Sequence, residues 1–137
     1  MKRETALRIA EEIAAKLQAC NGVVDTPTAR WPQVLVSELW MFGSTVKGAE
    51  RPNDLDLLWE AKVLGEFRRP GEGGAELDMR RYRRYGISTA KEPFEEARRV
   101  LVGGRKMVRL HFKGIDGDLA YPRRLLFKIE GAPVEAA

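Results

Sequence analysis

The sequence predicts a single small domain of the mixed α/β or α+β class. Segments with helical periodicity and segments with strand character follow one another in the order helix, strand, strand, charged insertion, helix, strand, short strand and tail. At 137 residues the chain has the length of one ordinary domain, and no internal repeat or long linker divides it. Hydrophobic residues make up 44% of the chain, which is enough for one core. We therefore expect residues 1–137 to form one domain.

The first helix is expected from Glu4 to Ala19. Its apolar residues recur at steps of three and four, namely Ala6, Ile9, Ala10, Ile13, Ala14 and Leu17. Asn21-Gly22 would end this helix in a left-handed turn. Residues 25–32 are rich in Thr and Pro and predict a loop. The apolar, β-prone run from Val34 to Phe42 predicts the first strand.

A second strand is expected from Leu55 to Trp59, because this run is short and apolar and follows a turn-forming Arg-Pro-Asn sequence. A charged insertion follows at about residues 61–87, and its sequence favours no particular element. Residues 88–101 predict a second helix, with Pro93 in its first turn and Gly103-Gly104 beyond its end. One side of this helix is expected to be apolar, with Phe94, Ala97, Val100 and Leu101.

The run from Met107 to Lys113 alternates in polarity and predicts a half-buried strand. The side chains of Val108, Leu110 and Phe112 are expected to face the core. On the other face, a polar stripe of Arg109, His111 and Lys113 is expected to border the functional site. A short strand at 118–122 would follow the glycines at 114 and 117.

Composition narrows the class of function. Cys20 is the only cysteine and His111 the only histidine, so a Cys/His metal cluster or an internal disulfide is excluded, and a reducing, cytoplasmic setting fits. The sequence has no apolar run long enough for a signal peptide or a membrane span, so no membrane partner is expected. The net charge of +4 suits a polyanionic ligand, although a solvated basic surface would give the same charge.

Two aspartates head the predicted second strand. Because side chains two residues apart on a strand share a face, Asp54 and Asp56 would lie side by side while Leu55 and Leu57 enter the core. Paired carboxylates attract a hard divalent cation, and Mg²⁺ in particular is often held by one or two carboxylates together with substrate phosphates. A lone Asp-x-Asp is also common on solvated strand ends, so the pair needs a second feature beside it.

The second feature is a Gly-Ser pair at the end of the first strand. If Ser44 starts a helical turn after Phe42, Gly43 lets the backbone come close to a phosphate, and N–H groups of the turn can donate to the anion. A further glycine, Gly48, follows four residues after Ser44. The turn and the Asp54–Asp56 pair would then face one ligand.

This segment resembles the nucleotidyltransferase superfamily with the DNA polymerase β-like palm. The resemblance rests on a hydrophobic strand, Gly43-Ser44, Gly48 and the Asp54-x-Asp56 motif in that order, and it extends to the preceding helix and strand. It implies the nucleotidyltransferase fold of a minimal, single-domain type, with a small mixed β-sheet and helices packed on one face. Two Mg²⁺ or Mn²⁺ ions would be the cofactors, and Gly43, Ser44 and Gly48 would bind the nucleotide.

The family uses a third carboxylate from a neighbouring strand. Asp118 is expected to take this role as a catalytic and metal-binding residue, with Asp116 as the alternative third ligand. A strand running unbroken from Met107 would turn Asp118 toward the core, so a turn or bulge near the glycines at 114 or 117 has to reset the register.

The resemblance implies transfer of a nucleoside monophosphate from a nucleoside triphosphate, such as ATP, to an acceptor hydroxyl on a protein, a nucleic acid or a small molecule. Because little sequence is left for acceptor recognition, the choice of acceptor is expected to come from the insertion between Glu60 and Ser88, from a homodimer or from a helical partner protein. Two alternatives remain: a nucleotide- or nucleic-acid-binding module that is catalytically incomplete, and a toxin–antitoxin component of the minimal nucleotidyltransferase type.

Other residues are candidates for ligand contacts. Arginines that interleave with Tyr82 and Tyr85 can contact phosphates or nucleic acid, or else form an exposed charged surface. The candidates for such contacts are Arg80, Arg81, Arg83, Arg84 and Arg109. His111 is not expected to be catalytic, because no Ser-His-Asp arrangement is evident. The three tryptophans, Trp31, Trp40 and Trp59, are expected to be packing residues.

Overall fold

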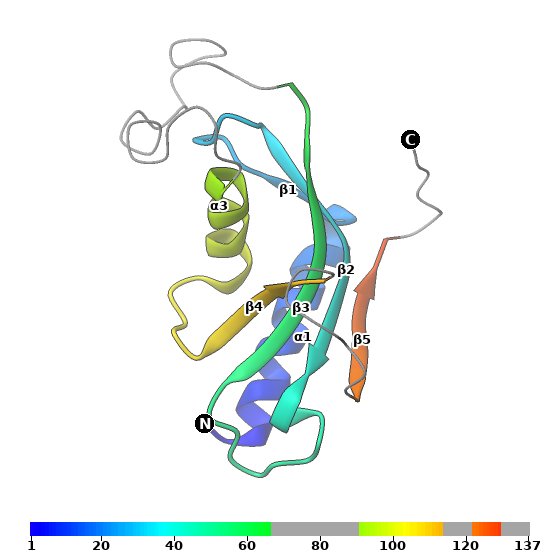
Figure 1. Cartoon of the computed structure of the whole chain (residues 1–137), viewed down its shortest axis with the longest axis vertical. Coiled ribbons are helices and arrows are strands. Elements are labelled where there is room, and N and C mark those ends of the chain that lie inside the picture. Colours follow the sequence, from blue (N-terminus) through cyan, green and yellow to red (C-terminus); the bar gives the residue numbers. More distant parts are fainter. Residues whose placement is uncertain (67–90, 114–121, 130–137) are drawn as a thin grey trace.

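The computed structural model describes residues 1–66, 91–113 and 122–129 of the chain, and in these residues it has a mixed sheet covered by two helices (Figure 1). The elements, in chain order, are α1 (Arg3–Cys20), β1 (Val23–Asp25), β2 (Gln33–Phe42), the single 3-10 turn η1 (Gly43–Thr45), β3 (Leu55–Leu64), α3 (Lys91–Val102), β4 (Val108–Phe112) and β5 (Arg123–Lys128). The mixed α and β class predicted from the sequence is confirmed at this level.

The sheet has the order β1-β2-β3-β4, and β5 pairs with β2. Both β1 and β5 run antiparallel to β2, on different stretches of it. On its other side β2 pairs antiparallel with β3, which in turn pairs parallel with β4. Strand β3 therefore lies in the middle of the sheet, and residues from the strands on both sides of it can meet at its first residues.

Helix α1 has the extent and the buried side that the sequence predicted. All six predicted apolar positions are buried, because their spacing places them on one side of the helix. The helix ends at Asn21, whose φ of 47° is left-handed, and Gly22 N–H donates to the Leu17 carbonyl at 2.9 Å. The predicted left-handed end of the helix is thus confirmed.

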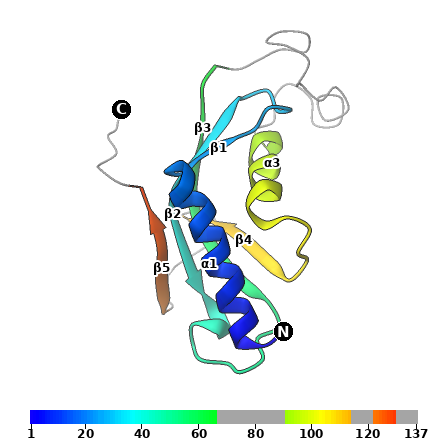
Figure 2. The ribbon, with the colours of Figure 1, turned by 180° about the vertical axis from the view of Figure 1, so that it is seen from behind.

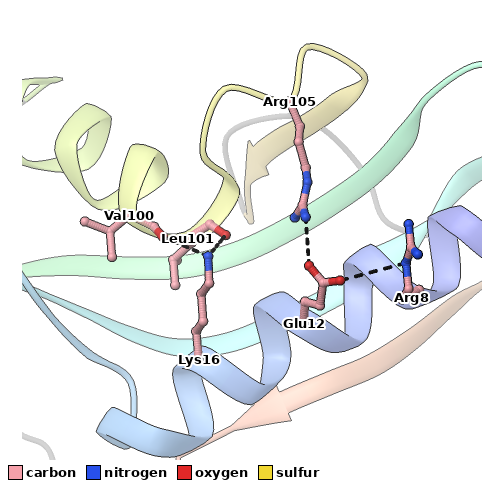
Figure 3. Close-up of polar contacts among 6 residues, drawn as sticks. All are labelled: Arg8, Glu12, Lys16, Val100, Leu101 and Arg105. Atoms are coloured by element: carbon pink, nitrogen blue, oxygen red, sulfur yellow. Dashed lines mark hydrogen bonds and ion pairs between the residues drawn. The ribbon is translucent and has the colours of Figure 1, made fainter.

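Both helices pack on the same face of the sheet. Residues of α1 and α3 form one core with alternate residues of β2 and β3, including Val34, Val36, Leu39, Met41, Leu55, Leu57 and Trp59. Figure 2 shows α1 in front of β2 when the molecule is seen from behind. The side chain of Lys16 joins the helices by donating to the carbonyls of Val100 and Leu101, each at 3.2 Å, and Arg105 pairs with Glu12 at 2.7 Å (Figure 3).

The second helix differs in one detail from the prediction. Ala97 and Leu101 are buried, as expected, but the side chain of Val100 is 49% exposed. The buried side of α3 runs through Leu101 and Val102 instead, which turns Val100 toward solvent. Residues 88–90, the start of the predicted helix, lie outside the described part of the chain. Gly103, with φ 71°, follows the last residue of α3 as predicted.

The sheet is larger than the sequence predicted. Strand β3 continues to Leu64, so residues 61–64 belong to the sheet and not to the charged insertion. Neither β1 nor β5 was predicted as a strand, and Asp25, the last residue of β1, was expected to begin a loop. Both strands pair with the same edge of β2, β1 with residues that follow it closely in the sequence and β5 with residues far from it in the sequence. Most of the short strand predicted at 118–122 lies outside the described residues.

In the part of the chain that the structure describes, we find no helix of the length and apolar character needed to cross a membrane.

Candidate functional site

The candidate site lies on the face of the sheet that is opposite the two helices, which we call the polar face. Strand pairing brings its residues together in two neighbouring rows across the sheet. One row consists of Arg123, Phe42, Asp56 and Arg109, and the next row consists of Leu125, Trp40, Leu58 and His111. Four strands contribute to each row. The site is therefore assembled from segments that lie far apart in the sequence.

The carboxylate pair has the arrangement that the Asp-x-Asp spacing predicted. Leu55 and Leu57 are fully buried on the helix side, whereas the side chains of Asp54 and Asp56 are 31% and 24% exposed. Burial raises the pKa of Asp56, and the neighbouring negative charge of Asp54 adds to this, while His111 and Arg109 act in the opposite direction. The two carboxylates are thus close enough to influence each other.

The Gly43 turn lies directly against this pair. Gly43 has φ 77°, which is a left-handed conformation, and begins η1 immediately after β2. A Cβ atom built on Gly43 would lie 2.6 Å from Asp56 Oδ2, which is closer than Cβ atoms approach other heavy atoms, so the carboxylate would have to shift. The position therefore requires glycine twice, for its backbone and for the space that the carboxylate occupies. Phe42 pairs with Asp56, which is why the turn and the carboxylate meet.

Ser44 belongs to the same turn, as predicted, although nothing of its side chain is described. Gly48 has φ 92° and its N–H donates to the Thr45 carbonyl at 3.2 Å. A Cβ atom on Gly48 would meet nothing within 4 Å. The structure thus places Gly43 against the carboxylates but gives Gly48 a role in the shape of the loop.

Basic residues of β4 contact both carboxylates. Arg109 Nε lies 3.4 Å from Asp54 Oδ2, and His111 Nε2 lies 3.7 Å from Asp56 Oδ1. The ring of His111 also makes an edge contact with Phe42, with centroids 5.4 Å apart. The predicted polar stripe of β4 does border the site. Its contact with the carboxylates depends on the parallel register of β3 and β4, which no local sequence signal gives.

Trp40 and Arg123 form the other side of the site, and sequence reasoning missed both. Trp40 was expected to be a packing residue, but it is half-buried on the polar face, and its Nε1 donates to Glu38 Oε1 at 2.8 Å. Arg123 Cζ lies 4.4 Å from the centroid of the Trp40 ring. By contrast, Trp59 is 2% exposed and packs edge-on against Phe94 and Phe112, so its predicted core role is confirmed. Trp31 is half-buried.

Glu38 links β2 with the end of β4 across the polar face. Its Oε1 atom accepts from Lys113 Nζ at 2.9 Å as well as from Trp40. Burial alone would raise the pKa of Glu38, but the hydrogen bonds from Lys113 and Trp40 hold it below the ordinary value. This ion pair fixes the Trp40 side of the site.

Other predicted residues lie outside the described part of the chain: Asp116, Asp118, Arg80, Arg81, Arg83 and Arg84. Among the described residues, no group of three His, Cys, Asp or Glu side chains is placed to hold a metal ion. The donors that are described, Asp54 and Asp56, nonetheless suit Mg²⁺ or Mn²⁺. They are hard oxygen ligands on one face, and a bound dication would offset the burial and repulsion that raise the pKa of Asp56.

Comparisons of the chain with protein-family models, with curated proteins and with solved structures found no match. The grounds for a functional proposal are therefore the chain's own residues and the geometry of the polar face.

Proposed function

We propose that the protein is a metal-dependent nucleotidyltransferase that moves a nucleoside monophosphate from a nucleoside triphosphate to an acceptor hydroxyl. The close contact between the Gly43 turn and the Asp56 carboxylate supports this proposal most directly. Such an arrangement places a backbone turn that can approach phosphate beside ligands for the divalent cation that accompanies it. The resemblance of residues 42–60 to the nucleotidyltransferase motif points to the same reaction.

Each residue has a role in this proposal. Asp54 and Asp56 would hold two Mg²⁺ or Mn²⁺ ions, and Asp118, or Asp116 in its place, would supply the third carboxylate. When bound, the ions would lower the pKa of the attacking hydroxyl and offset charge on the phosphates. The turn at Gly43 and Ser44 would position the triphosphate.

Arg109 would change partner when the substrate binds. Its side chain is 63% exposed and pairs with Asp54 across 3.4 Å, so solvent screens the pair and little free energy is lost when it opens. A guanidinium released from Asp54 can donate two parallel hydrogen bonds to a phosphate. We thus propose that Arg109 pairs with Asp54 in the free protein and with the triphosphate once the substrate is bound.

Label transfer tests the proposal. The full-length chain would be incubated with each labelled nucleoside triphosphate, with Mg²⁺ or Mn²⁺, and with protein, RNA, DNA and small-molecule acceptors. We expect transfer to one class of acceptor, which would be lost in Asp54→Ala and Asp56→Ala. Glu60→Ala is the matched control, since Glu60 lies on β3 and its side chain is exposed. Transfer that survives both aspartate substitutions would disprove the mechanism.

A second candidate is a nucleotide- or nucleic-acid-binding module with an incomplete metal site. The contacts of Arg109 and His111 with the two carboxylates favour it, because basic side chains then stand beside the acids where the proposed cations would bind. Absence of transfer with every acceptor, together with metal-independent binding of nucleotide or nucleic acid, would support this module over the enzyme.

A further inference from the structure

One row of the polar face contains Arg123, a cation that the sequence did not single out, together with Asp56, a proposed metal ligand. Phe42 of β2 pairs on one side with Arg123 and on the other with Asp56, which in turn pairs with Arg109. Since partners on adjacent strands lie about 5 Å apart, the Cα atoms of Arg123 and Asp56 are separated by about 10 Å. Arg123 therefore faces the carboxylates across a single aromatic residue.

The Arg123 side chain is held in place by its stacking on Trp40. Its Cζ atom lies 4.4 Å from the ring centroid, and the ring is itself fixed by the hydrogen bond from Trp40 Nε1 to Glu38. Stacking of this kind uses the flat face of the guanidinium and supplies no acceptor for the N–H groups at its edge. Trp40 thus restricts the orientation of Arg123 without satisfying its hydrogen bonds.

At least one of those N–H groups has no acceptor in the structure. The Nη1 atom of Arg123 is buried and has no hydrogen-bond partner, and among the described residues no carboxylate pairs with this arginine. A buried donor without an acceptor is unfavourable, and a charged donor especially so. This cost is removed if a ligand supplies the acceptor.

We propose that Arg123 binds phosphate oxygens of the nucleoside triphosphate, on the side of Phe42 that is opposite Asp56, and that Trp40 is its positioning residue. The identity of the ligand rests on the proposed function, whereas the presence of an anion site at Arg123 does not. Phosphate fits better than a nucleobase, because Trp40 already covers a face of the guanidinium and the unsatisfied edge suits the paired oxygens of a phosphate.

Binding of inorganic tripolyphosphate tests this site without any catalytic step. Isothermal titration of the full-length chain with tripolyphosphate and Mg²⁺ would be compared for the native protein and for Arg123→Gln. We expect Arg123→Gln to weaken binding by at least about tenfold, since a charge-assisted pair of hydrogen bonds is lost. Arg124→Gln is the matched control, because Arg124 is exposed and pairs with Met41, whose side chain belongs to the core. It should bind like the native protein.

Variants of Trp40 provide a second measurement if Arg123→Gln does not fold. Trp40→Phe keeps an aromatic ring beneath the guanidinium and should retain most of the affinity for tripolyphosphate. Trp40→Leu removes the ring and should lower the affinity, although both variants keep the charge of Arg123. Equal affinity of Trp40→Leu and the native protein would overturn the positioning role.

The proposal is overturned if the native chain does not bind tripolyphosphate, or if Arg123→Gln and Arg124→Gln bind it equally. It is also overturned if Arg123→Gln loses affinity only for a short single-stranded oligonucleotide, since Arg123 would then contact an acceptor. Failure of nucleotidyl transfer is a separate result. A chain that transfers no label but binds tripolyphosphate through Arg123 would refute the enzyme and retain the anion site.

Discussion

Gly43 lies so close to Asp56 that no side chain fits between them: an added Cβ atom would be 2.6 Å from Asp56 Oδ2. Gly43 directly follows the last residue of β2 and Asp56 is the second residue of β3, and the antiparallel pairing of these strands brings the two residues together. The contact joins the two halves of the candidate site, which are the backbone turn and the carboxylate pair.

Substitution of Gly43 should therefore damage the site more than substitution of another left-handed glycine. We expect Gly43→Ala to destabilise the fold by about 1–3 kcal/mol, because the backbone is strained and the Asp56 carboxylate has to move. Gly48→Ala has the strain alone, since its Cβ meets nothing within 4 Å. Denaturant unfolding measures stability, and label transfer measures function. Equal loss of transfer in the two variants would contradict the steric role of Gly43.

Asp56→Asn should make the metal-free protein more stable, and it should abolish label transfer when the metal is present. Burial raises the pKa of Asp56, so ionisation of this group costs folding free energy as the pH rises through its folded-state pKa. The variant lacks this cost. We expect a gain of about 0.5–1 kcal/mol at pH 7 in the presence of a chelator. The gain should disappear at pH values below the ordinary value of 3.8. A variant less stable than the native protein at pH 7 would contradict this expectation.

Glu38→Gln should have the opposite dependence on pH. Hydrogen bonds from Lys113 and Trp40 outweigh burial and hold the pKa of Glu38 below 4.5, so its contribution to stability is present above that pH and is lost as the pH falls through the folded-state pKa. Because the side chain of Glu38 is only 15% exposed, we expect a loss of about 1 kcal/mol at pH 7. Urea unfolding at pH 7 and at pH 3 would measure the difference.

Glu12→Gln is the control for that prediction. The hydrogen bond from Arg105 likewise lowers the pKa of Glu12, but the side chain of Glu12 is 43% exposed and solvent screens the pair. Its substitution should change stability less than that of Glu38. A larger effect of Glu12→Gln would show that burial does not set the strength of these ion pairs.

Lys16→Met should loosen the packing of α3 on α1. The ammonium of Lys16 donates to two carbonyls in the last turn of α3, where a cation is also favoured by the helix dipole. We expect a loss of about 0.5–1 kcal/mol, with increased amide hydrogen exchange in α3. Lys106→Met, at an exposed lysine just beyond α3, is the control and should leave exchange in α3 unchanged.

The third carboxylate can be assigned by paired substitutions. We expect Asp118→Asn to abolish label transfer and Asp116→Asn to reduce it little, since Asp118 is the proposed third metal ligand. Mn²⁺ affinity, followed by electron paramagnetic resonance, should fall in the same order. The reverse order would assign the role to Asp116, and retention of transfer in both variants would remove the third carboxylate from the mechanism.

Periodicity predicted the elements whose stability depends mainly on their own pattern of apolar residues. α1 and β2 were placed to within one residue at each end, because α1 has one apolar side and β2 is a nearly continuous apolar run. The strands β1 and β5 were missed, since they are short and their assignment depends on pairing with β2. Val100 was misplaced because the side of α3 that is buried is chosen by the helix and sheet beneath it.

The residues of the site also fall into those that a local pattern predicts and those that depend on strand pairing. The spacing of Asp54 and Asp56 and the glycine after Phe42 are local features, and a local pattern was sufficient to bring them to notice. Arg123 and Trp40 carry no such signal. Each became a candidate only when β5 was seen to pair with β2 on the polar face.

The sequence by itself determined the α and β class, the alternation that turns two aspartates away from the core, and the glycine turn after Phe42, because each depends on residues a few positions apart. Only the tertiary structure decided that Arg109 and His111 contact those aspartates and that Arg123 lies across Phe42 from them. The physical reason is strand register, which is set by packing and hydrogen bonding between distant segments and which determines the side chains that share a row.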